Sequence, residues 1–189
     1  MQLSSATKWL LIIVGIVALI AIVLGAKYNS FVKQNEGVTA QWAQVESQYQ
    51  RRYDLIPNLV NSVKGVMKQE QTVFDDIAKA RSQYAGAQTP DQKAAAASQV
   101  ETSLGRLLVV MENYPQLRSV ETAQSLMAEL SGTENRISVE RMRYNEMVRD
   151  YNVSIKTFPG SLIAGMFGFQ TRTMFEAASG AENAPQVQF

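Results

Sequence analysis

The apolar and polar positions of the chain form one continuous apolar run followed by longer stretches in which apolar residues alternate with polar ones. Residues 9–26 carry no charge and no proline, and Lys8 and Lys27 border them. About 18 residues at about 1.5 Å per residue extend about 27 Å, close to the hydrocarbon thickness of a bilayer. Trp9 and Tyr28 stand at the two ends, where aromatic rings favour the membrane interface. The run therefore predicts a single transmembrane helix in contact with membrane lipid.

A cleaved signal peptide is the alternative interpretation of this run. The run is longer than the usual apolar core of about 7 to 15 residues, and Leu24-Gly25-Ala26 is a poor cleavage site, so we expect an uncleaved anchor. The absence of cysteine excludes a lipoprotein. The basic residues on its two sides balance, so the positive-inside rule does not decide which side of the membrane holds the rest of the chain.

The first amphipathic stretch runs from Tyr28 to Tyr84, where apolar residues return every three to four positions. This spacing predicts a helix with one buried face. Pro57 is the candidate break, because it removes an amide and clashes with the preceding turn. Asp54 is suited to cap a helix that restarts there, although we favour a continuous helix kinked at Pro57. Gly65 is a milder interruption, costing about 1 kcal/mol relative to alanine.

Two further helices are expected, separated by turn residues. Thr89-Pro90-Asp91 has the composition of a helix start, so a second helix is expected from there to about Asn113. Tyr114-Pro115 stops it, because the residue before proline is pushed out of the helical region. A third helix is expected over about 117–157, ending at Phe158-Pro159-Gly160. The short connections make consecutive helices antiparallel neighbours.

The predicted fold class is all-α: an N-terminal transmembrane helix followed by an antiparallel bundle of three to four long helices. The predicted segments are a short tail 1–8, the transmembrane helix 9–26, the bundle 27–158, an apolar C-terminal segment 159–176 and a flexible tail 177–189. The apolar segment is too short to cross a membrane. In a three-helix order it lies far from the bilayer and covers the bundle end or a neighbouring subunit, whereas a four-helix order broken at Pro57 reverses its position.

Composition limits the chemistry available to the chain. It contains no histidine and no cysteine, which removes the usual base at neutral pH, the thiolate nucleophile and most zinc ligands. The formal net charge is +1 and the basic residues are scattered, so no nucleic-acid partner is expected. We therefore predict no enzymatic activity, no cofactor, no metal site and no catalytic residue.

The first group of candidate recognition residues surrounds the proline of the first long helix: Arg51, Arg52, Tyr53, Asp54, Pro57 and Asn58. Two neighbouring arginines are able to clamp an anion, with Tyr53 stacking on it and Asp54 orienting a guanidinium. Alternatively, the same residues make ion pairs between helices or satisfy the carbonyls that Pro57 leaves free. The sequence leaves both interpretations open.

The second group lies on the third helix: Asn135, Arg136, Tyr144, Asn145, Tyr151 and Asn152. The Tyr-Asn pair repeats after seven residues, so both pairs lie along one seam, as in a coiled coil. We favour a seam that fixes register and partner choice through hydrogen bonds. The alternative is a polar groove for a ligand or a partner helix.

Four segments together resemble the bacterial LemA family from about Tyr28 to Phe175: QRRYDLIPNLV at 50–60 with Val63-Lys64-Gly65; ENYPQL at 112–117; GTENRI at 132–137; and the two Tyr-Asn pairs ahead of Phe158-Pro159. The chain departs from the family pattern at Arg118-Ser119-Val120 and Ala123. The resemblance implies a membrane-anchored, mostly antiparallel helical bundle in the bacterial inner (cytoplasmic) membrane. It implies no established activity, only an association with membrane proteases or envelope-remodelling systems.

Two functions fit these observations. The first is a self-assembling scaffold or interaction module of the cell envelope, because the amphipathic helices and the apolar segment offer surfaces that a slender bundle cannot bury alone. This function predicts a homo-oligomer. The second is a ligand-binding or sensory module, or an adaptor for envelope protein partners such as membrane proteases.

Overall fold

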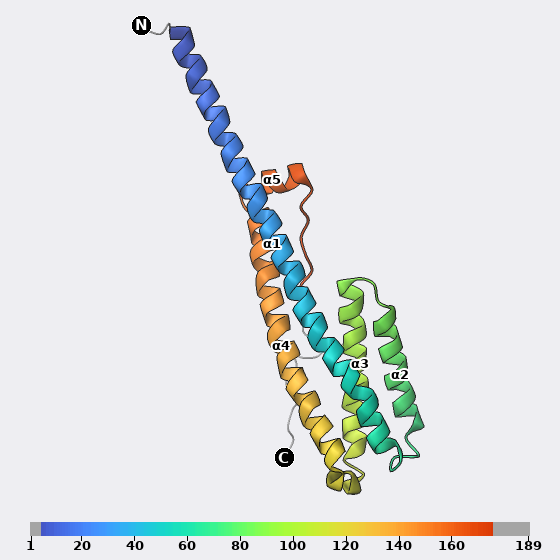
Figure 1. Ribbon diagram of the computed structural model, residues 1–189. Coiled ribbons are helices and arrows are strands. Elements are labelled where there is room, and N and C mark those ends of the chain that lie inside the picture. The colour runs from blue at the N-terminus through green and yellow to red at the C-terminus, as the bar shows by residue number, and fades with distance from the viewer. Residues whose placement is uncertain (1–4, 176–189) are drawn as a thin grey trace, which may run out of the picture. The chain divides into compact units, whose positions relative to one another are not determined.

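The computed structural model describes residues 5–175, and its regular elements are helices (Figure 1). Their order is α1 (Ser5–Lys64), α2 (Gln71–Gly86), α3 (Pro90–Met111), the 3-10 helix η1 (Pro115–Ser119), α4 (Glu121–Lys156) and α5 (Gly160–Phe167). No strand occurs in the described range, which confirms the predicted all-α class. The predicted tail 177–189 and the first four residues of the tail 1–8 lie outside the described residues.

The described chain forms two compact units. The first, here the anchor unit, contains residues 5–40 and Asn145–Arg172, which include the N-terminal part of α1, the C-terminal part of α4, and α5. The second, here the bundle unit, contains Gln41–Tyr144 and residues 173–175, so it holds parts of α1 and α4 together with all of α2 and α3. Each unit has its own buried side chains and is described by itself.

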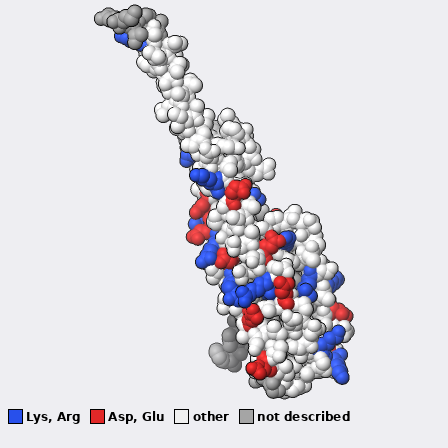
Figure 2. Space-filling view, in the orientation of Figure 1, with Lys and Arg blue, Asp and Glu red and all other residues white. Residues whose placement is uncertain are grey.

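The N-terminal part of α1 is a candidate membrane span. Its most apolar 18-residue window has a mean hydropathy of 3.0, and none of that window is buried inside the protein. Figure 2 shows no charged side chain on the visible face of this stretch. A helix that is apolar on every side needs a non-aqueous cover, which a bilayer supplies. The structure is thus consistent with a membrane protein with one N-terminal span.

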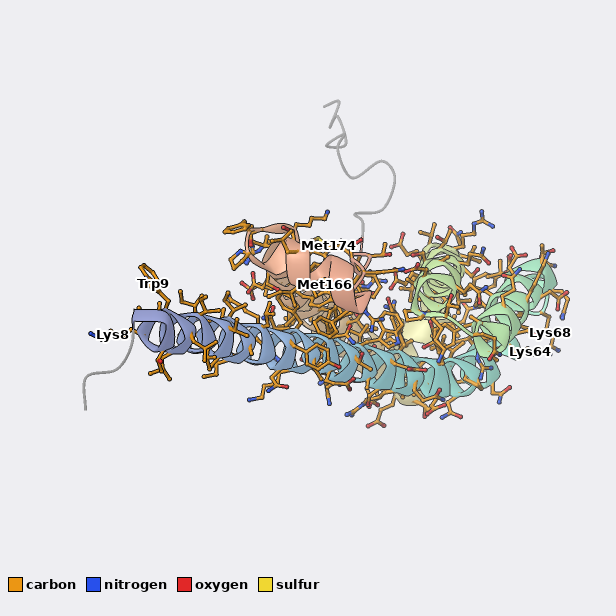
Figure 3. The ribbon with its side chains drawn as sticks, turned by 90° about the horizontal axis from the view of Figure 1, so that it is seen from above. Lys8, Trp9, Lys64, Lys68, Met166 and Met174 are labelled. Atoms are coloured by element: carbon orange, nitrogen blue, oxygen red, sulfur yellow. The ribbon has the colours of Figure 1, made fainter. Side chains whose placement is uncertain are left out.

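α1 continues through Pro57 and ends at Lys64, which Figure 3 labels near Lys68. The favoured continuous helix is therefore present, and the restart at Pro57 is not. Ile56 and Leu59 on either side of Pro57 are fully buried. Their packing offsets the roughly 3 kcal/mol that an internal proline costs a helix.

The expected single helix over 28–84 is instead broken at residues 65–70. The amides of Val66 and Met67 both donate to the carbonyl of Val63 at 3.0 Å and close α1 with a turn. Met67 is fully buried, so the connection itself contributes to the core. The hydroxyl of Tyr114 donates to Glu70 at 3.1 Å and ties this connection to the one after α3. Tertiary packing, together with the low helix propensity of glycine at position 65, places the break here.

α2 and α3 pack side by side as a helical hairpin (Figure 1). The predicted helix start at Thr89 is confirmed. The Thr89 hydroxyl accepts from the amide of Gln92 at 3.2 Å, and the Gln92 side chain accepts from the amide of Thr89 at 3.3 Å. This reciprocal capping box, with Pro90 in the first turn, satisfies two amides that the helix cannot pair internally.

Because of the break at 65–70, four helices contribute to the bundle unit, the upper end of the predicted three to four. The C-terminal part of α4 belongs to the anchor unit. There the Phe167 ring lies 4.9 Å from the Tyr28 ring, and the Phe169 ring lies 5.4 Å from the Phe31 ring. The apolar segment thus packs beside the end of the candidate span. This differs from the expectation that it lies far from the bilayer, because the chain reverses once more than the three-helix order assumed.

Gly160 allows α5 to approach its neighbours closely. A Cβ atom at this position would overlap the backbone carbonyl of Ser154 and would lie 2.9 Å from Cζ of Phe31. Gly160 is buried, as are Ile163 and Ala164 on the same side of α5. The lack of a side chain at Gly160 therefore sets the distance between α5, α4 and α1.

We predict that Gly160→Ala destabilises the anchor unit by about 1 to 3 kcal/mol, because the added methyl has no space in a packed site. Thermal unfolding of the full-length protein in mild detergent measures this loss. Gly165→Ala is the matched control, because nothing lies within 4 Å of a Cβ placed there. That variant should keep or slightly raise the unfolding temperature, since alanine favours helix. Equal unfolding temperatures for the two variants would contradict the packing argument.

Candidate functional site

A network of partly buried charges links α1, α3 and α4 inside the bundle unit. The Arg52 side chain is 9% exposed, forms an ion pair with Glu134, and lies 3.9 Å from the carboxylate of Glu101. Arg141 pairs with Glu101 at 3.0 Å and donates from Nε to the hydroxyl of Tyr49 at 2.7 Å. Two guanidinium groups thus share two carboxylates and one phenol, which offsets the cost of burying their charges.

Burial controls the protonation of this network. It raises the pKa of Tyr49 to about 12, against the opposing effect of the Arg141 charge. Burial also raises the pKa of Glu101 above its ordinary value, again against Arg141. A phenol with a raised pKa stays protonated at neutral pH and is a poor base. The arrangement therefore joins α1, α3 and α4 through paired charges.

The first predicted group, around Pro57, is divided between the surface and the core. Arg51 is exposed and pairs with Glu129 at 3.0 Å, whereas Arg52 points inward to Glu134. Asp54 is exposed and accepts a hydrogen bond from Gln50. The two arginines engage different carboxylates of α4, so the geometry is that of ion pairs between helices and not of a shared anion clamp.

The remaining members of this group serve packing or face solvent. The Tyr53 ring lies 4.2 Å from the Tyr84 ring and 6.0 Å from the Tyr49 ring. The hydroxyls of Tyr53 and Tyr84 are buried and have no hydrogen-bond partner among the described residues. Pro57 is half-buried and Asn58 is exposed. The structure brings Tyr53 into an aromatic core and leaves Asn58 apart from it.

The second predicted group holds the non-helical segment that follows α5. In the anchor unit the Asn152 side chain donates to the carbonyl of Arg172 at 2.8 Å and accepts from its amide at 2.9 Å. The Tyr151 hydroxyl donates to the carbonyl of Gln170 at 3.0 Å. The Arg172 guanidinium donates to Asn35 at 2.9 Å. This half of the seam therefore binds the backbone of the chain itself.

In the bundle unit Tyr144 likewise binds the backbone of the segment that follows α5. Its hydroxyl donates to the carbonyl of Thr173 at 3.2 Å. The Phe175 ring stacks on Trp42 at 5.4 Å, and the Arg141 guanidinium lies 5.2 Å above the Phe175 ring. Ring stacking and cation–π contacts of this kind require an aromatic side chain at position 175, whereas the hydrogen bond to Thr173 requires only a backbone carbonyl.

These contacts form one wall of a groove of about 990 Å³, here the aromatic groove. Its floor on α3 consists of small side chains, and its other walls are aromatic or carry paired charges. The lining residues are Trp42, Pro90, Asp91, Ala94, Ala95, Ser98, Glu101, Thr102, Arg141, Tyr144, Thr173, Met174 and Phe175. Within residues 5–175 no group of three acidic side chains is placed to hold a metal ion. The groove is suited to bind a peptide segment.

Of the twelve predicted residues, Tyr144 alone lines the groove. Asn135 and Arg136 are exposed on α4, and Asn145 is half-buried in the anchor unit. Conversely, sequence reasoning did not select Arg141 or Glu101. Arg141 stands at core spacing between Ile137 and Tyr144, so a charged residue within an apolar stripe was the available signal.

We predict that Tyr49→Phe weakens the dependence of stability on pH above pH 9. The folded-state pKa of about 12 exceeds the ordinary tyrosine pKa of 10.0, which the unfolded state retains. The unfolded state therefore loses the proton first, and stability falls as pH rises from 10 to 12. Between pH 9 and 11 the wild type should lose about 1 kcal/mol more than the variant, measured by urea unfolding.

Two comparisons make this pH experiment specific. Burial also raises the pKa of Tyr53 and Tyr84, so both proteins retain some loss of stability at high pH. Tyr28→Phe is the control, because this ring is 38% exposed, and it should follow the wild type. Parallel curves for Tyr49→Phe and the wild type from pH 9 to 11 would show that burial of Tyr49 does not control its ionisation.

We predict that Asn152→Ala exposes the peptide bond after Arg172 to trypsin. The substitution removes two hydrogen bonds worth about 1 kcal/mol each, so opening of this segment should increase roughly tenfold or more. The initial rate of cleavage at Arg172, followed by mass spectrometry in detergent, measures the change. Asn135→Ala on the exposed face of α4 is the matched control and should cleave like the wild type. Equal rates for both variants would exclude a clamping role of Asn152.

The profile of the LemA family matches residues 41–189. The chain is 27% identical over 190 residues to magnetosome protein MamQ 2 and to magnetosome protein MamQ 1 of Paramagnetospirillum magneticum, covering 87% of this chain and 70% of each relative. It is 25% identical to magnetosome protein MamQ of Magnetospirillum gryphiswaldense, covering 85% of this chain and 70% of that protein. The family match covers most of the sequence, and the chain belongs to the LemA family.

Proposed function

We propose that this LemA-family protein is a non-enzymatic, single-pass membrane protein that acts as a self-assembling scaffold or interaction module of the bacterial cell envelope. The observation that carries the proposal is the aromatic groove of the bundle unit. Trp42, Arg141 and Tyr144 bind residues 173–175 there through a backbone carbonyl and an aromatic ring. Through these contacts a segment of the chain itself forms one wall of the groove.

The chemistry of the groove favours binding over catalysis. Arg141 in its lining is neutralised by an ion pair with Glu101. Its remaining walls offer rings, small side chains and the Tyr144 hydroxyl. Such surfaces recognise a peptide by main-chain hydrogen bonds and by side-chain pockets.

Self-assembly follows if the segment in the groove is exchanged between copies. The contacts that hold Thr173 and Phe175 are the same whether the segment comes from the same chain or a neighbouring one. Val109 on α3 and Met142 on α4 are 64% and 63% exposed in the bundle unit, which provides apolar surface for a second copy. The assembly proposed here is a homo-oligomer held by exchanged segments.

An adaptor for other envelope proteins, such as membrane proteases, is the second candidate function. The specific observation in its favour is again the groove, since a segment of a different protein is able to make the same backbone and ring contacts. A ligand-binding or sensory role uses the same surface, with the Arg141 guanidinium and the Glu101 carboxylate as its charged groups. The mass of the isolated protein separates self-assembly from these alternatives.

We predict that the full-length protein, extracted in mild detergent, is a discrete homo-oligomer by light scattering and mass photometry. Dilution across a wide concentration range should leave the stoichiometry unchanged, as expected for exchanged segments. A monomer at every concentration would overturn the self-assembling scaffold and would favour the adaptor.

The source of the segment is tested in the same sample. The chain has no cysteine, so Ala95→Cys and Met174→Cys introduce single reactive positions in the groove lining and keep the rings that hold the segment. A mixture of the two variants, reassembled and treated with a bis-maleimide, should yield a covalent dimer if segments are exchanged. A mixture of Ala95→Cys with Asn135→Cys is the control and should stay uncrosslinked. If the mixture gives no covalent dimer while a protein carrying Ala95→Cys and Met174→Cys in one chain is cross-linked internally, the segment stays with its own chain.

A further inference from the structure

α5 exposes apolar side chains that the described chain leaves uncovered. No charged residue occurs between Lys156 and Arg172. Leu162 and Met166, one helical turn apart, are 62% and 70% exposed, and Phe167 is 52% exposed. Figure 3 labels Met166 on this helix. An exposed apolar face on so short a helix marks a contact with another apolar phase or molecule.

The opposite face of α5 is fixed to the rest of the anchor unit. Ile163 is 1% exposed and Ala164 is 5% exposed, and Gly160 packs against α4 and Phe31. α5 is therefore apolar on both faces, with protein on one of them only. A helix with this composition is expected to be covered on all sides, either by protein or by lipid.

The position of α5 along α1 favours lipid. Trp9 and Tyr28 are separated by about 28 Å along the helix, which matches the hydrocarbon thickness, so Tyr28 stands at the membrane interface when Trp9 stands at the other. The rings of Phe167 and Phe169 lie 4.9 Å and 5.6 Å from the Tyr28 ring. Figure 1 shows α5 beside α1 within this unit, and Figure 2 shows no charged side chain on the visible face of α5 or of the apolar stretch of α1.

We propose that α5 is a second membrane contact, an interfacial helix that lies in the same bilayer surface from which α1 emerges. Leu162, Met166 and Phe167 insert between the headgroups and the acyl chains of that leaflet. Lys27 and Lys156, both exposed, border the apolar surface and reach the phosphate groups of the lipids. The protein thus holds the membrane at two places in the anchor unit.

This proposal rests on the α1 span being in the membrane and goes beyond the scaffold function. A span alone is free to tilt and to rotate about its axis, whereas a second contact beside it restricts both motions. The membrane therefore fixes one side of the anchor unit toward its surface. A second copy of the chain or a partner protein on the same face is the competing occupant.

The test attaches an environment-sensitive fluorophore to single cysteines of the full-length protein in liposomes of phosphatidylcholine and phosphatidylglycerol. The test positions are Met166→Cys and, as an independent second, Leu162→Cys. Ile20→Cys in the candidate span is the lipid-exposed reference, and Asp150→Cys on the exposed face of α4 in the same unit is the aqueous control. Lipids carrying a spin label near the headgroup serve as quenchers for the positions on α5, and lipids labelled deep in the acyl chain serve for Ile20→Cys, which lies about 12 Å from Tyr28 along the helix.

We expect blue-shifted emission at Met166→Cys and Leu162→Cys, with quenching roughly threefold or more above that at Asp150→Cys. A blue shift without quenching by labelled lipid would show that protein covers α5 and would overturn the proposal. Emission like that at Asp150→Cys would overturn it as well. Absence of quenching at Ile20→Cys would overturn both the anchor and this inference, whereas quenching at Ile20→Cys alone rejects only the role of α5.

Discussion

The guanidinium groups of Arg52 and Arg141 are tolerated inside the bundle unit because Glu101 and Glu134 neutralise them. Breaking one partner of such a set leaves a buried charge uncompensated, which costs about 3 to 5 kcal/mol. The network therefore favours the register of α1, α3 and α4 in which these pairs form. That register places Tyr144, one turn after Arg141, on the wall of the aromatic groove.

The same register explains why the groove and the network share residues. Arg141 bonds Glu101 and Tyr49 inside the bundle, and its guanidinium also lies over the Phe175 ring at the groove wall. A segment that binds in the groove contacts the network directly. Binding in the groove and stability of the bundle are for this reason thermodynamically linked.

Local sequence signals predicted the helical class, the cap at Thr89 and the helix ends before the prolines, because these depend on backbone chemistry within a few residues. They did not locate the break at 65–70, where burial of Met67 and the hydrogen bond between Tyr114 and Glu70 act across the fold. Because the three-helix order lacked this break, it predicted the apolar segment far from the membrane span, whereas α5 lies beside Tyr28. A tertiary contact decided the topology.

In the candidate site, too, local spacing was predictable from the sequence and tertiary contacts were not. Heptad spacing aligned Tyr144 with Tyr151, but the segment that they bind has no periodic pattern to reveal it. Spacing also could not tell that Arg52 is buried while its neighbour Arg51 is exposed, since adjacent helical positions point about 100° apart and only packing selects one. Whether a charged side chain such as Arg52 is buried can be predicted only when the residues that pack against it are known.

The two hydrogen bonds of Asn152 engage the amide and the carbonyl of one residue, Arg172, and neither bond touches its side chain. An amide placed in this way distinguishes chain that is free of helix, whose backbone groups are unpaired, from chain that is helical. It conveys almost no information about which amino acid is bound. Asn152 thus selects a segment by its backbone conformation more than by its sequence. Segments of diverged sequence remain compatible with these two hydrogen bonds.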